Sequence, residues 1–189
     1  RLLAGLLAGK RITAEFTGDD SLAKRPMNRI INPLTEMGVV IESINGHIPF
    51  TIKPKELNGI SFFPSVASAQ VKSCIMLAGL GAIGQTVIDE NMKTRDHSEI
   101  ISKELGAPVS SNGTISINQL SRPLQPFEIN VPGDPSSAAF FAAAAALIPN
   151  SSITIKNVLA NPTRIGFFQV LKKMGGGVEW QNMRKECGE

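Results

Sequence analysis

Residues 33–41 read Pro-Leu-Thr-Glu-Met-Gly-Val-Val-Ile, the pattern of a helix that ends at a glycine and is followed by a strand. Similar stretches stand at residues 101–109 (Ile-Ser-Lys-Glu-Leu-Gly-Ala-Pro-Val) and 171–178 (Leu-Lys-Lys-Met-Gly-Gly-Gly-Val). In each, the glycine can take the left-handed conformation that closes a helix. The stretches recur with a period of about 69 residues, well above the 20 to 50 residues of solenoid repeats.

The residues around each glycine predict the same succession of elements. Apolar residues at helical spacing predict helices that end at the glycines, over residues 29–37, 97–105 and 165–174. Each is preceded by a strand-like segment, at residues 11–16, 85–89 and 152–158. An apolar helix is expected before each of those strands, at residues 2–8, 69–80 and 137–147. Further strands are expected after the first two glycines, at residues 48–52, 114–117 and 127–131.

The order of helix, strand, helix, strand, strand predicts an α/β fold made of repeated units. A unit of this size needs neighbours to bury its apolar face. A chance likeness is the alternative, because a helix that ends in glycine before a strand is common.

The composition is that of a folded protein without a general affinity for polyanions or membranes. The 189 residues suffice for one large domain or two smaller ones, and 42% are hydrophobic against 19% charged. The 19 basic and 16 acidic residues give a net charge of +3, so we expect at most local basic patches for small anions. The longest apolar run, residues 138–148, falls short of the roughly 20 residues of a spanning helix.

Cysteine and histidine are too few for a disulfide framework or a zinc cluster. Cys74 and Cys187 stand far apart, and the chain has two histidines. Cys74 lies within an apolar helix and is interpreted as a packing residue. We therefore expect a reducing, cytoplasmic setting and no metal site.

The stretch Gly79-Leu80-Gly81-Ala82-Ile83-Gly84 matches the G-x-G-x-x-G fingerprint of dinucleotide-binding proteins in letters only. That fingerprint needs a strand before it and a helix after it, so that the helix N-terminus meets the pyrophosphate. Here an apolar helix precedes the glycines and a strand follows them. We interpret the stretch as a helix stop and a turn.

Two predicted helix starts are candidate anion sites. Ser68 suits an N-cap, and the free amides of that first turn, with Gln70 beside them, can hold a phosphate or carboxylate. An ordinary cap is the alternative. Asp134, followed by Pro135, suits a second N-cap, but its carboxylate already occupies that terminus, so we interpret it as structural.

Cationic side chains stand in two loops. Lys24 and Arg25 precede a helix, and an arginine offers a rigid fork to phosphate or carboxylate, although a solvated loop pair is the simpler alternative. Arg95 and Asp96 are open to interpretation as a loop ion pair, and His97 is not assigned as a base. The residues alone thus predict a repeated α/β module with anion pockets.

Six stretches, taken together and in order, resemble the 5-enolpyruvylshikimate-3-phosphate synthase family. They are TGDDSL (17–22), KRPM (24–27), SAQVKS (68–73), KTRDH (93–97), VPGDPSSAAF (131–140) and NPTR (161–164). The resemblance implies the enolpyruvyl transferase fold, an inside-out α/β barrel of two domains, each with three β-α-β-α-β-β units. Residues 1–130 would form most of the first domain and residues 131–189 the start of the second, in a chain cut at both ends.

The resemblance also implies a reaction. Members of the family transfer the enolpyruvyl group of phosphoenolpyruvate to the 5-hydroxyl of shikimate 3-phosphate and release phosphate, without a metal or organic cofactor. The step belongs to the shikimate pathway to aromatic amino acids, and the herbicide glyphosate targets it. We expect these two small molecules as partners, neither nucleic acid nor membrane, and a monomeric intact enzyme in the bacterial cytoplasm, with the plastid as the alternative.

Five substrate-binding residues follow from the resemblance, position by position. Arg25 matches an arginine that grips phosphoenolpyruvate. Ser68, the backbone of Ala69, and Gln70 match contacts to shikimate 3-phosphate, and Gln70 also approaches phosphoenolpyruvate. Arg95 matches a residue on the shikimate side. The acid and base of the family match no position in this chain, so we assign no catalytic residue and expect the chain alone to be inactive.

Two alternatives stay open. The related enolpyruvyl transferase that acts on UDP-N-acetylglucosamine shares the fold but uses a reactive cysteine in a loop pattern that neither Cys74 nor Cys187 matches. A non-catalytic phosphate-binding module of the same fold is the second. With aromatic residues at 5%, base stacking on nucleic acid is not expected. No role is assigned to Arg1, whose match to the family is weak.

Overall fold

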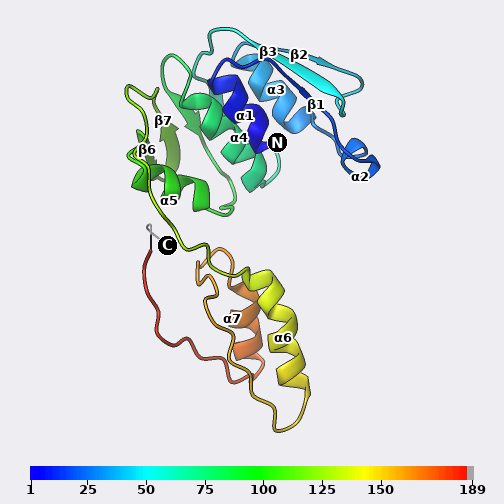
Figure 1. The fold of residues 1–189 in the computed structure, drawn as a ribbon, viewed down its shortest axis with the longest axis vertical. Coiled ribbons are helices and arrows are strands. Elements are labelled where there is room, and N and C mark those ends of the chain that lie inside the picture. The colour runs from blue at the N-terminus through cyan, green and yellow to red at the C-terminus, as the bar shows by residue number, and fades with distance from the viewer. Residues whose placement is uncertain (187–189) are drawn as a thin grey trace.

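The computed structural model describes residues 1–186 and shows two parts of different architecture (Figure 1). The N-terminal part (residues 1–125) contains two small sheets with helices packed beside them. The C-terminal part (residues 126–186) contains two helices and extended chain. In the described part of the chain, no helix is both long and apolar enough to cross a membrane.

The helices of the N-terminal part are α1 (Leu2–Gly9), α2 (Asp20–Ala23), α3 (Asn28–Glu36), α4 (Ala69–Gly79) and α5 (His97–Glu104). Its strands are β1 (Ala14–Phe16), β2 (Val39–Ser43), β3 (Phe50–Pro54), β4 (Ser61–Phe62), β5 (Thr86–Ile88), β6 (Val109–Asn112) and β7 (Thr114–Ile117). One sheet has the order β1-β3-β2 with antiparallel neighbours. The other has the order β4-β5-β7-β6, in which only β4 and β5 are parallel.

Helices α1 and α4 lie side by side at the centre of the N-terminal part, beneath the three-stranded sheet (Figure 1). A Cβ atom at Gly5 would lie 1.9 Å from the carbonyl oxygen of Cys74, and one at Gly81 would lie 2.0 Å from that of Gly9. Only glycine permits this approach of two backbones. Around the contact, the core holds fully buried apolar side chains from helices and strands, among them Ala4, Ala8, Ile30, Leu34, Ile52, Ile75, Ile88 and Ile117.

The predicted helices are confirmed, and so are the glycines that end three of them. All six helices begin and end within two residues of their expected bounds. Gly38, Gly106 and Gly175 have positive φ angles of 107°, 75° and 95°. The G-x-G-x-x-G stretch is also a helix stop, since α4 ends at Gly79 and β5 begins at Thr86.

The C-terminal part keeps the helices of the unit and lacks its sheet. Helices α6 (Pro135–Leu147) and α7 (Gly166–Lys173) pack against each other (Figure 1). The strands expected at 127–131 and 152–158 were wrong, because both segments are irregular and only a single bridge joins Gly133 to Val158. A strand needs a neighbour for its backbone groups, and within residues 1–186 neither segment is paired with one of the two sheets. Phe140 and Leu147 on α6 are consequently 79% and 82% exposed.

Candidate functional site

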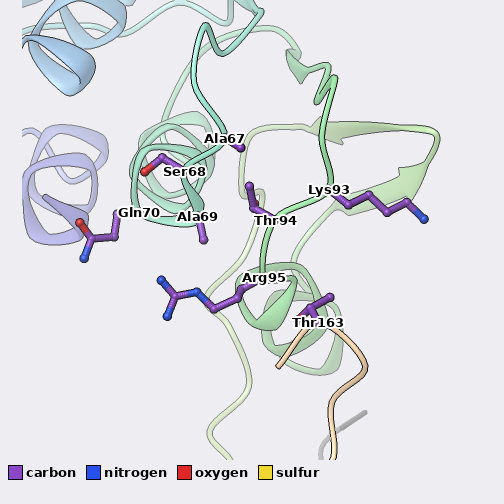
Figure 2. Close-up of a pocket in the computed structure, with 8 residues that line it drawn as sticks. All are labelled: Ala67, Ser68, Ala69, Gln70, Lys93, Thr94, Arg95 and Thr163. Atoms are coloured by element: carbon purple, nitrogen blue, oxygen red, sulfur yellow. The ribbon is translucent and has the colours of Figure 1, made fainter. Parts of the chain in front are cut away.

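A cavity of about 640 Å³ opens at the N-terminus of α4. Eight residues line it: Ala67, Ser68, Ala69, Gln70, Lys93, Thr94, Arg95 and Thr163 (Figure 2). They come from the turn before α4 and its first two residues, from the loop between β5 and α5, and from the C-terminal part. Four of the five residues predicted to bind substrate therefore meet in this cavity. They are Ser68, Ala69 and Gln70, and Arg95, which lies 25 residues after Gln70 in the sequence.

The α4 side of the cavity presents a helix start. Ser68 is extended, with φ −149° and ψ 106°, and its side chain accepts a hydrogen bond from the amide of Val71 at 3.5 Å. The predicted N-cap is thus confirmed. The first backbone bond of the helix runs from the amide of Lys72 to the carbonyl of Ser68. The amides of Ala69 and Gln70 precede it, so they and the helix dipole favour an anion in the cavity.

The opposite side carries the cations. Arg95 is exposed, and its guanidinium points toward the side of the cavity where Ala69 and Gln70 lie (Figure 2). Lys93 extends away from that side. None of the eight lining residues is a carboxylate or a histidine, so the side chains that line the cavity are neutral or cationic, as suits an anion.

Thr163 is a lining residue to which the sequence assigned no role. It belongs to a turn in which Asn161 Oδ1 accepts hydrogen bonds from the Thr163 amide at 2.7 Å and from its hydroxyl at 2.6 Å. Asn161 is buried and donates from Nδ2 to Asp96 at 2.9 Å. The Asn-Pro-Thr-Arg stretch was among those that resemble the family. That its threonine lines this cavity depends on how distant segments pack, which a local sequence pattern does not show.

Arg25 is not among the residues that line the cavity. It lies exposed in the loop between α2 and α3. Arg1 connects this loop to the cavity, because its guanidinium donates to Gln70 Oε1 at 2.9 Å and to the carbonyl oxygen of Pro26 at 3.0 Å. Sequence analysis assigned no role to Arg1, for which the weak match to a family arginine was the one signal.

Asp134 caps α6, as predicted. Its carboxylate accepts from the amides of Ser136 and Ser137 and pairs with Arg164. These contacts, the Ser136 amide first, hold the pKa of Asp134 below its usual value. The carboxylate is occupied by its own helix and by Arg164, which agrees with a structural role.

Cys74 lies in the core at the contact of α4 with α1. Burial raises the pKa of its thiol to about 12, so the nucleophilic thiolate is absent near neutral pH. This agrees with its interpretation as a packing residue. Cys187 lies outside the described residues. Within residues 1–186, no three histidine, cysteine or carboxylate side chains are grouped as a metal site would require.

The family model described as EPSP synthase (3-phosphoshikimate 1-carboxyvinyltransferase) matches residues 1–187. The chain belongs to the EPSP synthase family. It is 50% identical over 196 residues to a 3-phosphoshikimate 1-carboxyvinyltransferase of Sulfurihydrogenibium sp., a match that covers 100% of this chain and 45% of the relative. A relative of the same name from Thermodesulfovibrio yellowstonii is 48% identical over 192 residues, again with 100% of this chain and 45% of the relative covered.

The fold agrees with that of a solved family member. The EPSP synthase of Acinetobacter baumannii superimposes with a TM-score of 0.89 and is 41% identical, over 99% of this chain and 43% of that structure. The expected α/β fold is thereby confirmed. The chain spans less than half the length of the EPSP synthases that it matches.

Proposed function

We propose that this chain is part of an enzyme that transfers the enolpyruvyl group of phosphoenolpyruvate to the 5-hydroxyl of shikimate 3-phosphate and releases phosphate. The convergence of Ser68, Ala69, Gln70 and Arg95 on one cavity, in a member of the EPSP synthase family, carries the proposal. In that enzyme the cavity binds shikimate 3-phosphate. The Arg95 guanidinium points toward the start of α4 across the cavity, and both the guanidinium and the free amides of a helix start suit a small anion.

Arg25 is assigned to phosphoenolpyruvate in the same enzyme. Its loop adjoins the cavity through the bonds of Arg1 to Pro26 and Gln70, which supports a second substrate beside the first. Replacing Arg25 by alanine in the intact enzyme should raise the KM for phosphoenolpyruvate about tenfold, as expected for loss of a charge-assisted contact. An unchanged KM would remove Arg25 from the site.

The division of the chain follows the same proposal. Residues 1–130 form most of a first domain and residues 131–189 the start of a second, which supports the expectation that the chain alone does not turn over. The relatives matched are bacterial proteins, and the cytoplasm stays the predicted location. A monomeric intact enzyme also stays a prediction.

Calorimetric titration of the 189-residue chain with shikimate 3-phosphate tests the ligand. Binding is expected, and Arg95→Ala should weaken it about tenfold or more. Shikimate without its phosphate should bind far less tightly, and Arg122→Ala, an exposed arginine outside the cavity, should bind like wild type.

Phosphate release on mixing both substrates with the chain tests the division. We expect none. Steady release by the purified chain would show that a complete site is present within it.

The enolpyruvyl transferase specific for UDP-N-acetylglucosamine is not favoured. The family model matches the other transferase, and the buried Cys74 cannot act as that enzyme's reactive cysteine.

A further inference from the structure

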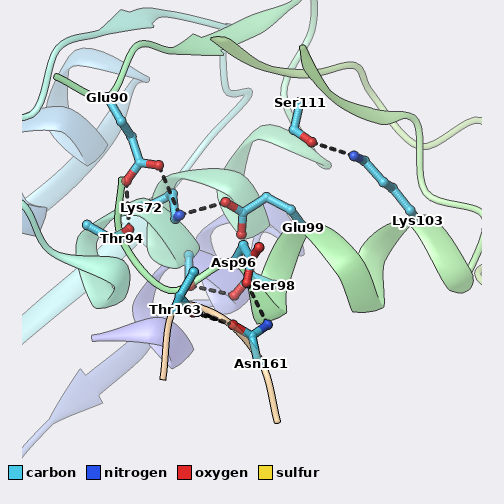
Figure 3. Close-up of polar contacts among 11 residues, drawn as sticks. Lys72, Glu90, Thr94, Asp96, Ser98, Glu99, Lys103, Ser111, Asn161 and Thr163 are labelled. Atoms are coloured by element: carbon cyan, nitrogen blue, oxygen red, sulfur yellow. Dashed lines mark hydrogen bonds and ion pairs between the residues drawn. The ribbon is translucent and has the colours of Figure 1, made fainter. Parts of the chain in front are cut away.

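Lys72 is a buried cation in the first turns of α4, one turn after Ser68. Its side chain is 1% exposed. The Nζ atom lies 2.6 Å from Oε1 of Glu99 and 3.1 Å from Oε2 of Glu90, and these two side chains are 5% and 12% exposed. Figure 3 shows the ammonium group between the two carboxylates, which come from opposite ends of the loop that carries Arg95.

A buried cluster of this kind contributes little to the stability of a fold. Three charged groups have lost their water, and their mutual attraction offsets that loss only when the geometry is good. Glu99 Oε2 is buried without a hydrogen-bond partner, which adds to the cost. In proteins generally, replacing such a buried cluster by apolar residues of similar volume is often neutral or stabilising. The geometry that the cluster imposes is therefore the better explanation of its presence.

Glu90 fastens the loop before Arg95. It follows β5, and its Oε1 accepts a hydrogen bond from the hydroxyl of Thr94 at 2.6 Å while its Oε2 faces Lys72. Thr94 lines the cavity directly before Arg95. One carboxylate thus connects α4 to the cavity wall.

Glu99 fastens the loop after Arg95. It lies in the first turn of α5 and pairs with Lys72. Beside it, the hydroxyls of Ser73 and Ser98 share a hydrogen bond of 2.5 Å, which joins the same two helices. Arg95 is therefore held from both sides against α4, the helix whose N-terminus forms the facing wall.

We propose that Lys72 is a positioning residue for the cavity: its ion pairs with Glu90 and Glu99 set the distance between the start of α4 and Arg95. Lys72 does not touch the ligand and acts on binding through Arg95. The inference rests on the proposed function in taking shikimate 3-phosphate as the ligand.

The test uses a variant that keeps the buried cluster uncharged. Lys72→Met alone leaves two buried carboxylates without a cation and can unfold the chain. The triple variant Lys72→Met/Glu90→Gln/Glu99→Gln, called here the neutral variant, removes the ion pairs without that penalty. It is compared with wild type, with Arg95→Ala, and with the neutral variant combined with Arg95→Ala. Thermal unfolding verifies that each is folded.

Titration with shikimate 3-phosphate separates positioning from stability. The neutral variant should bind shikimate 3-phosphate about tenfold more weakly than wild type. The neutral variant combined with Arg95→Ala should bind within about twofold of the affinity of Arg95→Ala alone. Wild-type affinity in the neutral variant, or an equal loss in both backgrounds, would overturn the proposal.

Hydrogen exchange gives a reading that needs no ligand. The hydrogen-bonded amides of α5, beginning with that of Ile100, which donates to the carbonyl of Asp96, should exchange at least about tenfold faster in the neutral variant, while those of α1 keep their wild-type rates. Unchanged exchange at these amides of α5 would also overturn the proposal. If the wild-type chain fails to bind shikimate 3-phosphate, the ligand assigned under the proposed function is wrong, and the exchange rates alone decide the role of Lys72.

Discussion

The N-terminal and C-terminal parts contain the same kind of helices but bury them differently. Helices α1 and α4 of the N-terminal part lie side by side, and all the residues of the connected core cluster fall in that part. Helix α6 of the C-terminal part is equally rich in apolar residues, yet only Pro135 and Ala138 of it are buried. A helix that is apolar on all sides is stable in water only when it is covered on all sides. The unit is thus a module whose core depends on its neighbours.

A substitution at the contact of α1 with α4 should have the largest effect on the unfolding free energy. In Gly5→Ala the new Cβ would collide with the backbone of Cys74, so α1 must move away from α4 and the core must open. We expect a loss of about 4 kcal/mol or more of unfolding free energy, at the upper end for a single substitution, measured by urea denaturation.

Gly166→Ala is the matched control in the C-terminal part. A Cβ at Gly166 would meet no atom within 4 Å, at the first residue of α7. Here we expect a stabilisation of up to about 1 kcal/mol. Similar effects of the two substitutions would contradict the difference in packing between the two parts.

Truncation of one apolar side chain in each part should show the same contrast, with a smaller effect on the unfolding free energy. Ile30→Ala removes a fully buried side chain of α3 and should lower the unfolding free energy by about 3 kcal/mol. Phe140→Ala removes a larger side chain that is 79% exposed, and should change it by less than about 0.5 kcal/mol. A loss above 2 kcal/mol for Phe140→Ala would mean that α6 is covered in solution.

The contact between the two parts is the next target. Asn161→Ala removes the hydrogen bond to Asp96 and the turn around Thr163. We expect a loss of about 1 kcal/mol and faster tryptic cleavage at Arg164 and Lys172, with the N-terminal part still resistant. Cleavage at an unchanged rate would show that other contacts hold the C-terminal part in place.

The smallest effect is a pH dependence at the start of α6. The pKa of Asp134 is lowered in the folded chain from its unfolded value near 3.8. The stabilisation of the fold by the ionised carboxylate is therefore complete above the unfolded pKa and is lost as the pH falls through the folded pKa. The amide signals of Ser136 and Ser137 should therefore shift below pH 4. Asp134→Asn keeps a capping oxygen, and its signals should not titrate there.

The helices could be predicted from the sequence because their signals are local. The glycine at position 38 closes α3 whatever surrounds it, and Ser68 caps α4 with its own side chain. The strand expected at 152–158 failed because pairing depends on a partner strand, which the segment's own pattern does not reveal.

At the candidate site, too, the residues with a local sequence signal could be predicted and those that depend on packing could not. Ser68, Ala69 and Gln70 were found from a helix start and a family motif. Lys72 and Glu99 were not, because a lysine and a glutamate on helices are usually solvated, and only packing shows that these are buried and paired.

The contact of α1 with α4 also bears on how the sequence can vary over evolution. At Gly5 and Gly81 the touching atoms belong to the backbone, which every residue type supplies, so no change in a neighbouring side chain can make room for a larger residue. Positions in the side-chain core can exchange volume with one another. A deep mutational scan should therefore find graded tolerance at Ile30 and Ile75, and a single accepted residue at Gly5.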